Sequence, residues 1–170
     1  YIRDGDCYQV NLAQRLSAPV RGDAWSAYLR LRARMASPYS AFLANGQASV
    51  LSFSPERFLR VAGGRVETRP IKGTRRRGAT PEADREQARQ LLVSAKDRAE
   101  NVMIVDLMRN DLGRSCRTGS VRVEQLCALE SYANVHHLVS VVSGEPDPAR
   151  GPTGLLADCF PGGSITGAPK

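Results

Sequence analysis

Residues 40–69 read SAFLANGQASVLSFSPERFLRVAGGRVETR and carry the clearest fold signal in the chain. The dipeptides Asn45-Gly46 and Gly63-Gly64 interrupt this stretch, and such dipeptides readily adopt the backbone conformation of tight hairpin turns. The runs between them are rich in apolar and β-branched residues. These runs cover 40–44, 48–53, 57–62 and 65–69. They predict an antiparallel β-meander.

Helix signals flank the meander on both sides. Asp23 can cap a helix that runs to about Met35. Thr80, followed by proline, starts a second helix, and Ser94, with an aspartate three residues later, starts a third. The third helix is expected to end before Gly113. Further strands are expected at 7–12, 121–123 and 132–143, a short helix after 153, and a loop at 70–79.

Grouped helices between antiparallel strands predict an α+β layered fold and argue against a parallel doubly wound sheet. The 170 residues are 42% hydrophobic and 24% charged, which is typical of one globular domain. The four cysteines form no CxxC pair, so we interpret them as reduced packing residues. Neither a leader nor a run of ~20 apolar residues is present, and we therefore expect a cytoplasmic protein with no membrane association.

The charge pattern disfavours a nucleic-acid-binding module. The net charge is +7, but the acidic residues are interspersed with the basic ones, and the aromatic residues, 6% of the chain, are scattered. Nucleic-acid binding would favour clustered cations with stacking aromatics. Nearly all the cations are arginine, and lysine occurs only at 72, 96 and 170. A lysine in a loop of such a chain suggests a need for an amine that can lose its proton, which arginine cannot do.

Seven phrases of the sequence, taken in order, resemble the chorismate-utilising enzymes, a family that includes anthranilate, isochorismate and aminodeoxychorismate synthases. They are 5–12 (GDCYQVNL), 54–58 (SPERF), 69–74 (RPIKGT), 96–101 (KDRAEN), 105–114 (VDLMRNDLGR), 135–140 (VHHLVS) and 162–170 (GGSITGAPK). The resemblance implies a sandwich of two antiparallel sheets with outer helices. Because the chain starts without methionine and stops in a glycine-rich phrase, we expect residues 1–170 to be part of a chorismate-binding catalytic domain, incomplete at both ends.

Lys72 is the most discriminating position within that family. The aminodeoxychorismate synthases carry lysine between Pro-Ile and Gly-Thr, whereas anthranilate synthases usually carry alanine there. The resemblance implies that the Lys72 amine attacks chorismate at ring C2, so that ammonia finally attaches at C4. By position alone, Lys72 would be a solvated loop cation.

Two further catalytic residues follow from the resemblance. Glu56 corresponds to the general acid and base that handles the C4 oxygen, although alone it would be an exposed partner of Arg57. His137 corresponds to a histidine near the departing C4 group, although a histidine among valines is otherwise a hydrogen-bonded core residue. Its neighbour His136 is expected to be structural.

The resemblance also implies half of a metal site and a substrate-binding loop. Glu100 corresponds to a glutamate that binds Mg²⁺, although its spacing from Lys96 also fits a plain ion pair. The glycine-rich loop, 162–168, has the glycine density of an anion-binding nest. The residues expected to bind the substrate are Gly163, Ser164, Thr166, Gly167 and Ala168.

The function implied is amination of chorismate at C4 to 4-amino-4-deoxychorismate, in the biosynthesis of p-aminobenzoate and folate. Ammonia would come from a glutamine amidotransferase subunit or fused domain. The alternative within the family is an anthranilate synthase component I. Residues 37–40 resemble a region that forms a tryptophan pocket in some relatives, and both a vestigial pocket and a plain strand start remain open.

Overall fold

The computed structural model describes residues 1–170, and the chain divides into two units. The larger unit consists of Tyr1–Asn11 and Phe58–Lys170, and the smaller one of Leu12–Arg57. All the strand pairings with a recorded register are antiparallel, as the sequence predicts.

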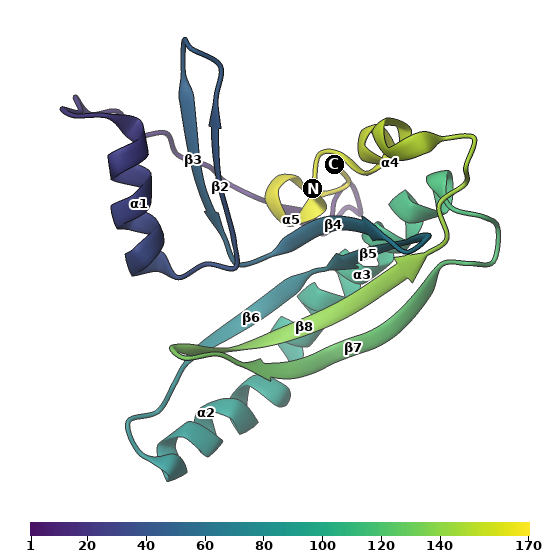
Figure 1. The fold of residues 1–170 in the computed structure, drawn as a ribbon. Coiled ribbons are helices and arrows are strands. Elements are labelled where there is room, and N and C mark those ends of the chain that lie inside the picture. The colour runs from purple at the N-terminus through teal and green to yellow at the C-terminus, as the bar shows by residue number, and fades with distance from the viewer. The chain divides into compact units, whose positions relative to one another are not determined.

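A five-stranded sheet forms the centre of the larger unit, with β8 as the strand that most of the others contact (Figure 1). β5 and β6 follow each other along one edge of β8, and β7 pairs with the other edge. β4 pairs with β5 at the end of the sheet. The strands are β4 (Arg57–Ala62), β5 (Arg65–Arg69), β6 (Ile71–Arg76), β7 (Arg122–Ser131) and β8 (Val135–Gly144).

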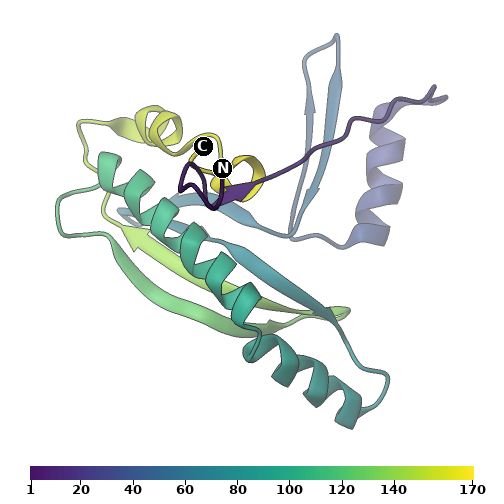
Figure 2. The same cartoon turned by 180° about the vertical axis from the view of Figure 1, so that it is seen from behind.

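Two helices, α2 (Pro81–Leu92) and α3 (Ala95–Ser115), cover one face of this sheet, and α3 runs along its length (Figure 2). The capping side chains are those expected, because Thr80 Oγ1 accepts from Ala83 N and Ser94 Oγ accepts from Asp97 N. The core lies between α3, the sheet and a later helix, α4 (Gly151–Cys159). It contains Val66, Val105, Leu112, Cys116, Val142, Leu155 and Cys159.

The two ends of the chain meet in a second, very small sheet. After α4 (Gly151–Cys159) and α5 (Gly163–Thr166), β9 (Gly167–Ala168) pairs with β1 (Gln9–Val10). This pairing fixes the glycine-rich loop to the start of the chain.

The smaller unit consists of α1 (Ala24–Met35) and a hairpin of β2 (Tyr39–Ala44) and β3 (Ser49–Ser54). Asp23 caps α1 as predicted. Asn45 Oδ1 closes the hairpin turn by accepting from Gln47 N and Ala48 N. The aromatic rings of α1 pack on the hairpin, with the Tyr28 ring 5.5 Å from that of Phe53. Tyr28 is the buried residue of α1.

Four local expectations were wrong. The strand expected at 121–123 is the ten-residue β7, because it pairs with β8 along its whole length. The loop expected at 70–79 is largely strand β6, because a bulge at Gly73 breaks the alternation that would have revealed it. Helix α3 passes through Gly113 and ends at Ser115. The strand expected at 7–12 is two residues long, and Tyr8 and Leu12 are exposed rather than half-buried, because β1 pairs only with the two residues of β9.

The cysteines pack much as expected. Cys116, Cys127 and Cys159 are buried and Cys7 is half-buried, all four with free thiols. None of the helices has the length and the apolar composition that crossing a membrane requires.

Candidate active site

Lys72 lies on β6 beside a β-bulge. It pairs with Leu138 on β8, whereas Thr74 pairs with His137, so the register shifts between the two pairs. Gly73, between them, has a φ of 81°, a conformation that glycine adopts at little cost. A side chain at Gly73 would also collide with Asp97 Cβ at 2.8 Å. The bulge therefore requires glycine at position 73, and it determines which residue of β8 lies opposite Lys72.

The register separates Lys72 from His137. Residues opposite each other in an antiparallel pair share a face, and successive residues of a strand alternate between faces. Ser140 bonds to Asn101 of α3 and therefore lies on the helix-covered face of the sheet. Leu138, two residues earlier on the same strand, lies on that face as well. Lys72 therefore lies on the helix-covered side, and His137 on the other face. The structure does not bring these two side chains face to face.

His137 has a defined set of neighbours on its own face. Its Nδ1 lies 2.9 Å from Thr74 Oγ1, and its ring stacks edge-on against Tyr132 with centroids 5.6 Å apart. Burial lowers the pKa of His137, against the opposing effects of a hydrogen bond to the Gly73 backbone and of Glu130. A neutral imidazole beside a hydroxyl can accept or relay a proton near neutral pH.

His136 points to the helices, as expected for a structural residue. It is 2% exposed, its Nδ1 lies 2.8 Å from Ser131 Oγ, and its Nε2 lies 3.0 Å from Asp84 Oδ1 on α2. This histidine therefore fastens α2 to the sheet.

Asn101 joins α3 to the strand opposite Lys72, and the sequence reasoning missed its role. It is 0% exposed, and its Nδ2 donates to the Leu138 carbonyl at 3.1 Å. Ser140 Oγ donates to Asn101 Oδ1 at 2.5 Å and accepts from Cys127 N at 2.8 Å. A buried amide satisfied on both ends sets the position of a helix firmly. The signal was an uncharged polar residue one turn before the apolar pair Ile104 and Val105 of the same helix.

Glu100 precedes Asn101 on α3 and pairs with Lys96 one turn earlier on the same helix. Its carboxylate lies 3.9 Å from Lys96 Nζ, and the two side chains are 41% and 83% exposed. So exposed a pair contributes little stability, and a cation or substrate can displace it easily. No three His, Cys, Asp or Glu side chains gather at metal-binding spacing in the structure. One carboxylate completed by substrate oxygens and water is nevertheless a donor set that Mg²⁺ accepts.

The glycine-rich loop packs directly on α3 and β1. A side chain at Gly163 would lie 2.1 Å from Leu107 Cδ2, and one at Gly167, where φ is 107°, would lie 2.3 Å from the Gln9 carbonyl. Asn11 Nδ2 donates to the Ser164 carbonyl at 3.1 Å. The amides of Ile165, Thr166 and Gly167 are engaged within the turn. Substrate contact by this loop stays a prediction from the resemblance.

Glu56 belongs to the smaller unit, where it follows β3 and is half-buried. Its backbone N–H donates to Ser54 Oγ at 3.1 Å, and Ser54 Oγ donates to its carbonyl, so the Ser-Pro-Glu turn is closed locally. Glu56 therefore belongs to a different unit from Lys72 and His137.

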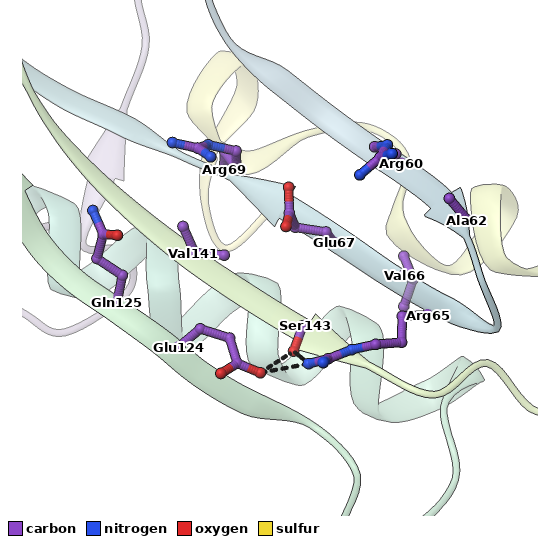
Figure 3. A pocket seen from close by; sticks show the side chains of 10 residues that line it. All are labelled: Arg60, Ala62, Arg65, Val66, Glu67, Arg69, Glu124, Gln125, Val141 and Ser143. Carbon is purple, nitrogen blue, oxygen red and sulfur yellow. Dashed lines mark hydrogen bonds and ion pairs between the residues drawn. The ribbon is translucent and has the colours of Figure 1, made fainter. Parts of the chain in front are cut away.

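A cavity of about 350 Å³ opens on the helix-free face of the large sheet (Figure 3). Arginines 60, 65 and 69 and glutamates 67 and 124 line it. Arg65 donates to Glu124 at 2.5 Å and to Ser143 Oγ at 2.7 Å, so these charges are paired across the strands. None of the residues predicted for the site lines this cavity.

The chain belongs to the chorismate binding enzyme family, whose model matches residues 1–170. It is 52% identical, over all of its residues, to aminodeoxychorismate synthase component 1 of Salmonella typhimurium and to that of Escherichia coli. It covers 37% and 38% of those proteins, so it spans a little over a third of their length. It is also 47% identical, over its full length, to an anthranilate synthase component 1 of Haloarcula marismortui, of which it covers 35%.

Solved structures of the family share the fold. The anthranilate synthase component I of Streptococcus pneumoniae superposes with a TM-score of 0.85 at 38% identity, covering 99% of this chain and 37% of that one. The menaquinone-specific isochorismate synthase of Escherichia coli gives a TM-score of 0.68 at 19% identity over 85% of this chain and 33% of that one. The predicted α+β fold with antiparallel sheets is thereby confirmed.

Proposed function

We propose that the protein containing this chain aminates chorismate at C4, using ammonia from a glutamine amidotransferase subunit or domain. The observation that carries the proposal is Lys72 on β6, held beside the Gly73 bulge on the same side of the sheet as α3. The high identity to several aminodeoxychorismate synthase components supports it.

The chemistry divides one difficult displacement into two easier ones. The Lys72 amine forms a bond to ring C2 while the ring double bonds shift and the C4 hydroxyl, protonated by Glu56, leaves as water. Ammonia then attacks C4, the double bonds shift back, and the C2–nitrogen bond breaks to release the lysine. Chorismate and ammonia thus give 4-amino-4-deoxychorismate and water.

The remaining groups orient the substrate. Glu100 would hold Mg²⁺, and that ion would neutralise the ring carboxylate of chorismate. We assign the glycine-rich loop to the substrate carboxylates. The resemblance gives His137 a proton near the C4 group, but the register places His137 and Lys72 on opposite faces of the sheet, so His137 has no part in the proposed chemistry. The substrate, the amidotransferase partner, the metal and the cytoplasmic location all form part of this proposal. Residues 1–170 would then be a part of the catalytic domain.

A covalent trap tests the role of Lys72. The full-length protein is incubated with a chorismate analogue that forms a stable C2 adduct, and the modified peptide is identified by mass spectrometry. We expect the adduct on Lys72 and a loss of amination on the order of 10³-fold or more in Lys72→Ala. Arg76→Ala, an exposed residue of the same strand, is the matched control and should stay within about twofold of wild type.

An adduct on another residue, or wild-type amination by Lys72→Ala, would overturn the assignment. The second candidate is amination at C2 to give anthranilate, which the match to the Streptococcus pneumoniae structure favours. The same assay separates the two functions, because p-aminobenzoate and anthranilate are distinguished by chromatography after conversion of the product.

A further inference from the structure

Asp111 is a buried carboxylate on α3 that none of the proposed chemistry uses. It is 1% exposed, and its Oδ2 lies 2.5 Å from Lys170 Nζ. This contact is an ion pair rather than a well-directed hydrogen bond. Lys170 Nζ also donates to the Cys159 carbonyl at 2.5 Å, and its side chain is only 18% exposed. Such a buried charge is costly unless an opposite charge compensates it.

The environment of Asp111 confirms how much it depends on Lys170. Burial raises the pKa of Asp111, and Lys170 opposes this rise more strongly than Arg114 does, while Asp158 adds to it. Without Lys170, burial and Asp158 would both disfavour the charged carboxylate, and only the weaker effect of Arg114 would oppose them.

The face of α3 that carries Asp111 also carries Glu100. Glu100, Ile104, Leu107 and Asp111 follow one another at spacings of four, three and four residues, which places them along one side of a helix. Gly163 packs against Leu107 and near Ile104, because a side chain on Gly163 would lie 2.1 Å and 3.8 Å from their methyl carbons. The glycine-rich loop is therefore seated on the same helix side, between Glu100 and Asp111.

The loop is held at both ends on α3. Gly163 fits against Leu107 at its start, and Lys170 pairs with Asp111 just after its last residue, Ala168. Between these points the loop spans only a few residues, so it has little freedom to slide. From Glu100 to Asp111 the helix rises about 16 Å.

We propose that Lys170 and Asp111 are positioning residues whose ion pair fixes the glycine-rich loop along α3 at a set distance from Glu100. The proposal rests on the function proposed above, in which the loop and Glu100 bind the same substrate. Misplacement of a binding group by about 1 Å can reduce the rate ~100-fold. The pair thus acts on substrate binding through the loop and touches no substrate itself.

The test uses three variants of the full-length protein: Lys170→Met, Asp111→Asn and the double variant. Lys170→Met leaves Asp111 buried without a partner, so its melting temperature should fall. In the double variant the buried charge is gone, so most of the stability should return. The KM for chorismate should rise about tenfold in Lys170→Met and stay raised in the double variant, with kcat changed much less. Arg109→Ala, an exposed residue of α3, is the control and should change neither value.

Recovery of the KM together with the stability in the double variant would show a purely structural pair and overturn the proposal. So would a KM within about twofold of wild type in Lys170→Met. Hydrogen exchange of a peptide covering 160–169 gives a readout that does not depend on activity. It should exchange faster in Lys170→Met and in the double variant, while peptides of β7 stay unchanged.

These measurements separate this inference from the proposed function. Should the wild-type protein make anthranilate, or fail to use chorismate, the proposed function falls. Faster exchange of 160–169 would then still support the tie to α3, and unchanged exchange would refute it.

Discussion

His137 lies on the helix-free face of β8 with its ring half-buried against Tyr132. Thr74 supplies a hydroxyl 2.9 Å from its Nδ1. A ring in such a place pays a desolvation cost when it becomes charged, which is why its pKa is lowered. The imidazole of His137 therefore binds a proton less strongly than an ordinary histidine does.

The lowered pKa predicts how stability depends on pH. In the window below the ordinary histidine value of 6.5, the unfolded chain binds more protons at this position than the folded chain does. Stability should therefore fall as the pH drops through that window. Urea unfolding of wild type and His137→Gln between about pH 5 and 7 measures the effect, and the variant should lose part of the pH dependence. Equal pH slopes in the two proteins would contradict the burial of a neutral imidazole.

Two glycines in neighbouring elements show how context decides the effect of the same substitution. Gly73 sits in the bulge of β6 with a positive φ and with Asp97 and Leu91 against it. Gly113 lies within α3 with no atom close enough to meet an added methyl group. The first is required by the backbone and the packing, whereas the second only weakens the helix.

We expect opposite results for alanine at these positions. Gly73→Ala should destabilise the full-length protein by about 2–4 kcal/mol, from backbone strain together with overpacking. Gly113→Ala should stabilise it by about 0.5–1 kcal/mol, because alanine is the better helix former. Thermal unfolding of both variants beside wild type measures the two effects. Destabilisation by Gly113→Ala of more than about 1 kcal/mol would show that α3 ends before this residue.

At the scale of the whole chain, the buried residues are unequally shared between the two units. The larger unit holds the core under α3, whereas Tyr28 is the residue of α1 that is buried. Trp25 is the only tryptophan of the 170 residues, and its ring lies 5.2 Å from that of Phe42 in the smaller unit. Its fluorescence therefore reports on that unit alone.

This division predicts unfolding transitions that do not coincide. In residues 1–170, Trp25 fluorescence should change at a lower urea concentration than the circular dichroism signal, which comes mainly from the larger unit. The reason is that a small unit buries too little apolar surface to match the stability of a larger core. Coincident transitions would show that the 170 residues unfold as one cooperative unit.

Local signals in the sequence determined much of this protein. Asp23, Thr80 and Ser94 start their helices as predicted, and Asn45-Gly46 and Gly63-Gly64 form the turns, because caps and tight turns depend on residues a few positions apart. The seven family phrases further indicated the family, which the comparisons confirm.

Only the tertiary structure decided the rest, since it depends on partners far away in the chain. The stretch 71–76 has no alternating pattern but forms β6, because β8 supplies its hydrogen-bond partners and the bulge at Gly73 absorbs the irregularity. The register of this pairing places Lys72 and His137 on different faces of the sheet. Asn101 is hydrogen-bonded to Leu138 and Ser140, and the buried charge of Asp111 is compensated by Lys170. These partners are too far apart in the sequence for any local pattern to predict them. These partners come together only when α3 packs on the sheet. The physical reason is that a buried polar group needs a hydrogen-bonding or charged partner, and only the folded chain brings such a distant partner into contact.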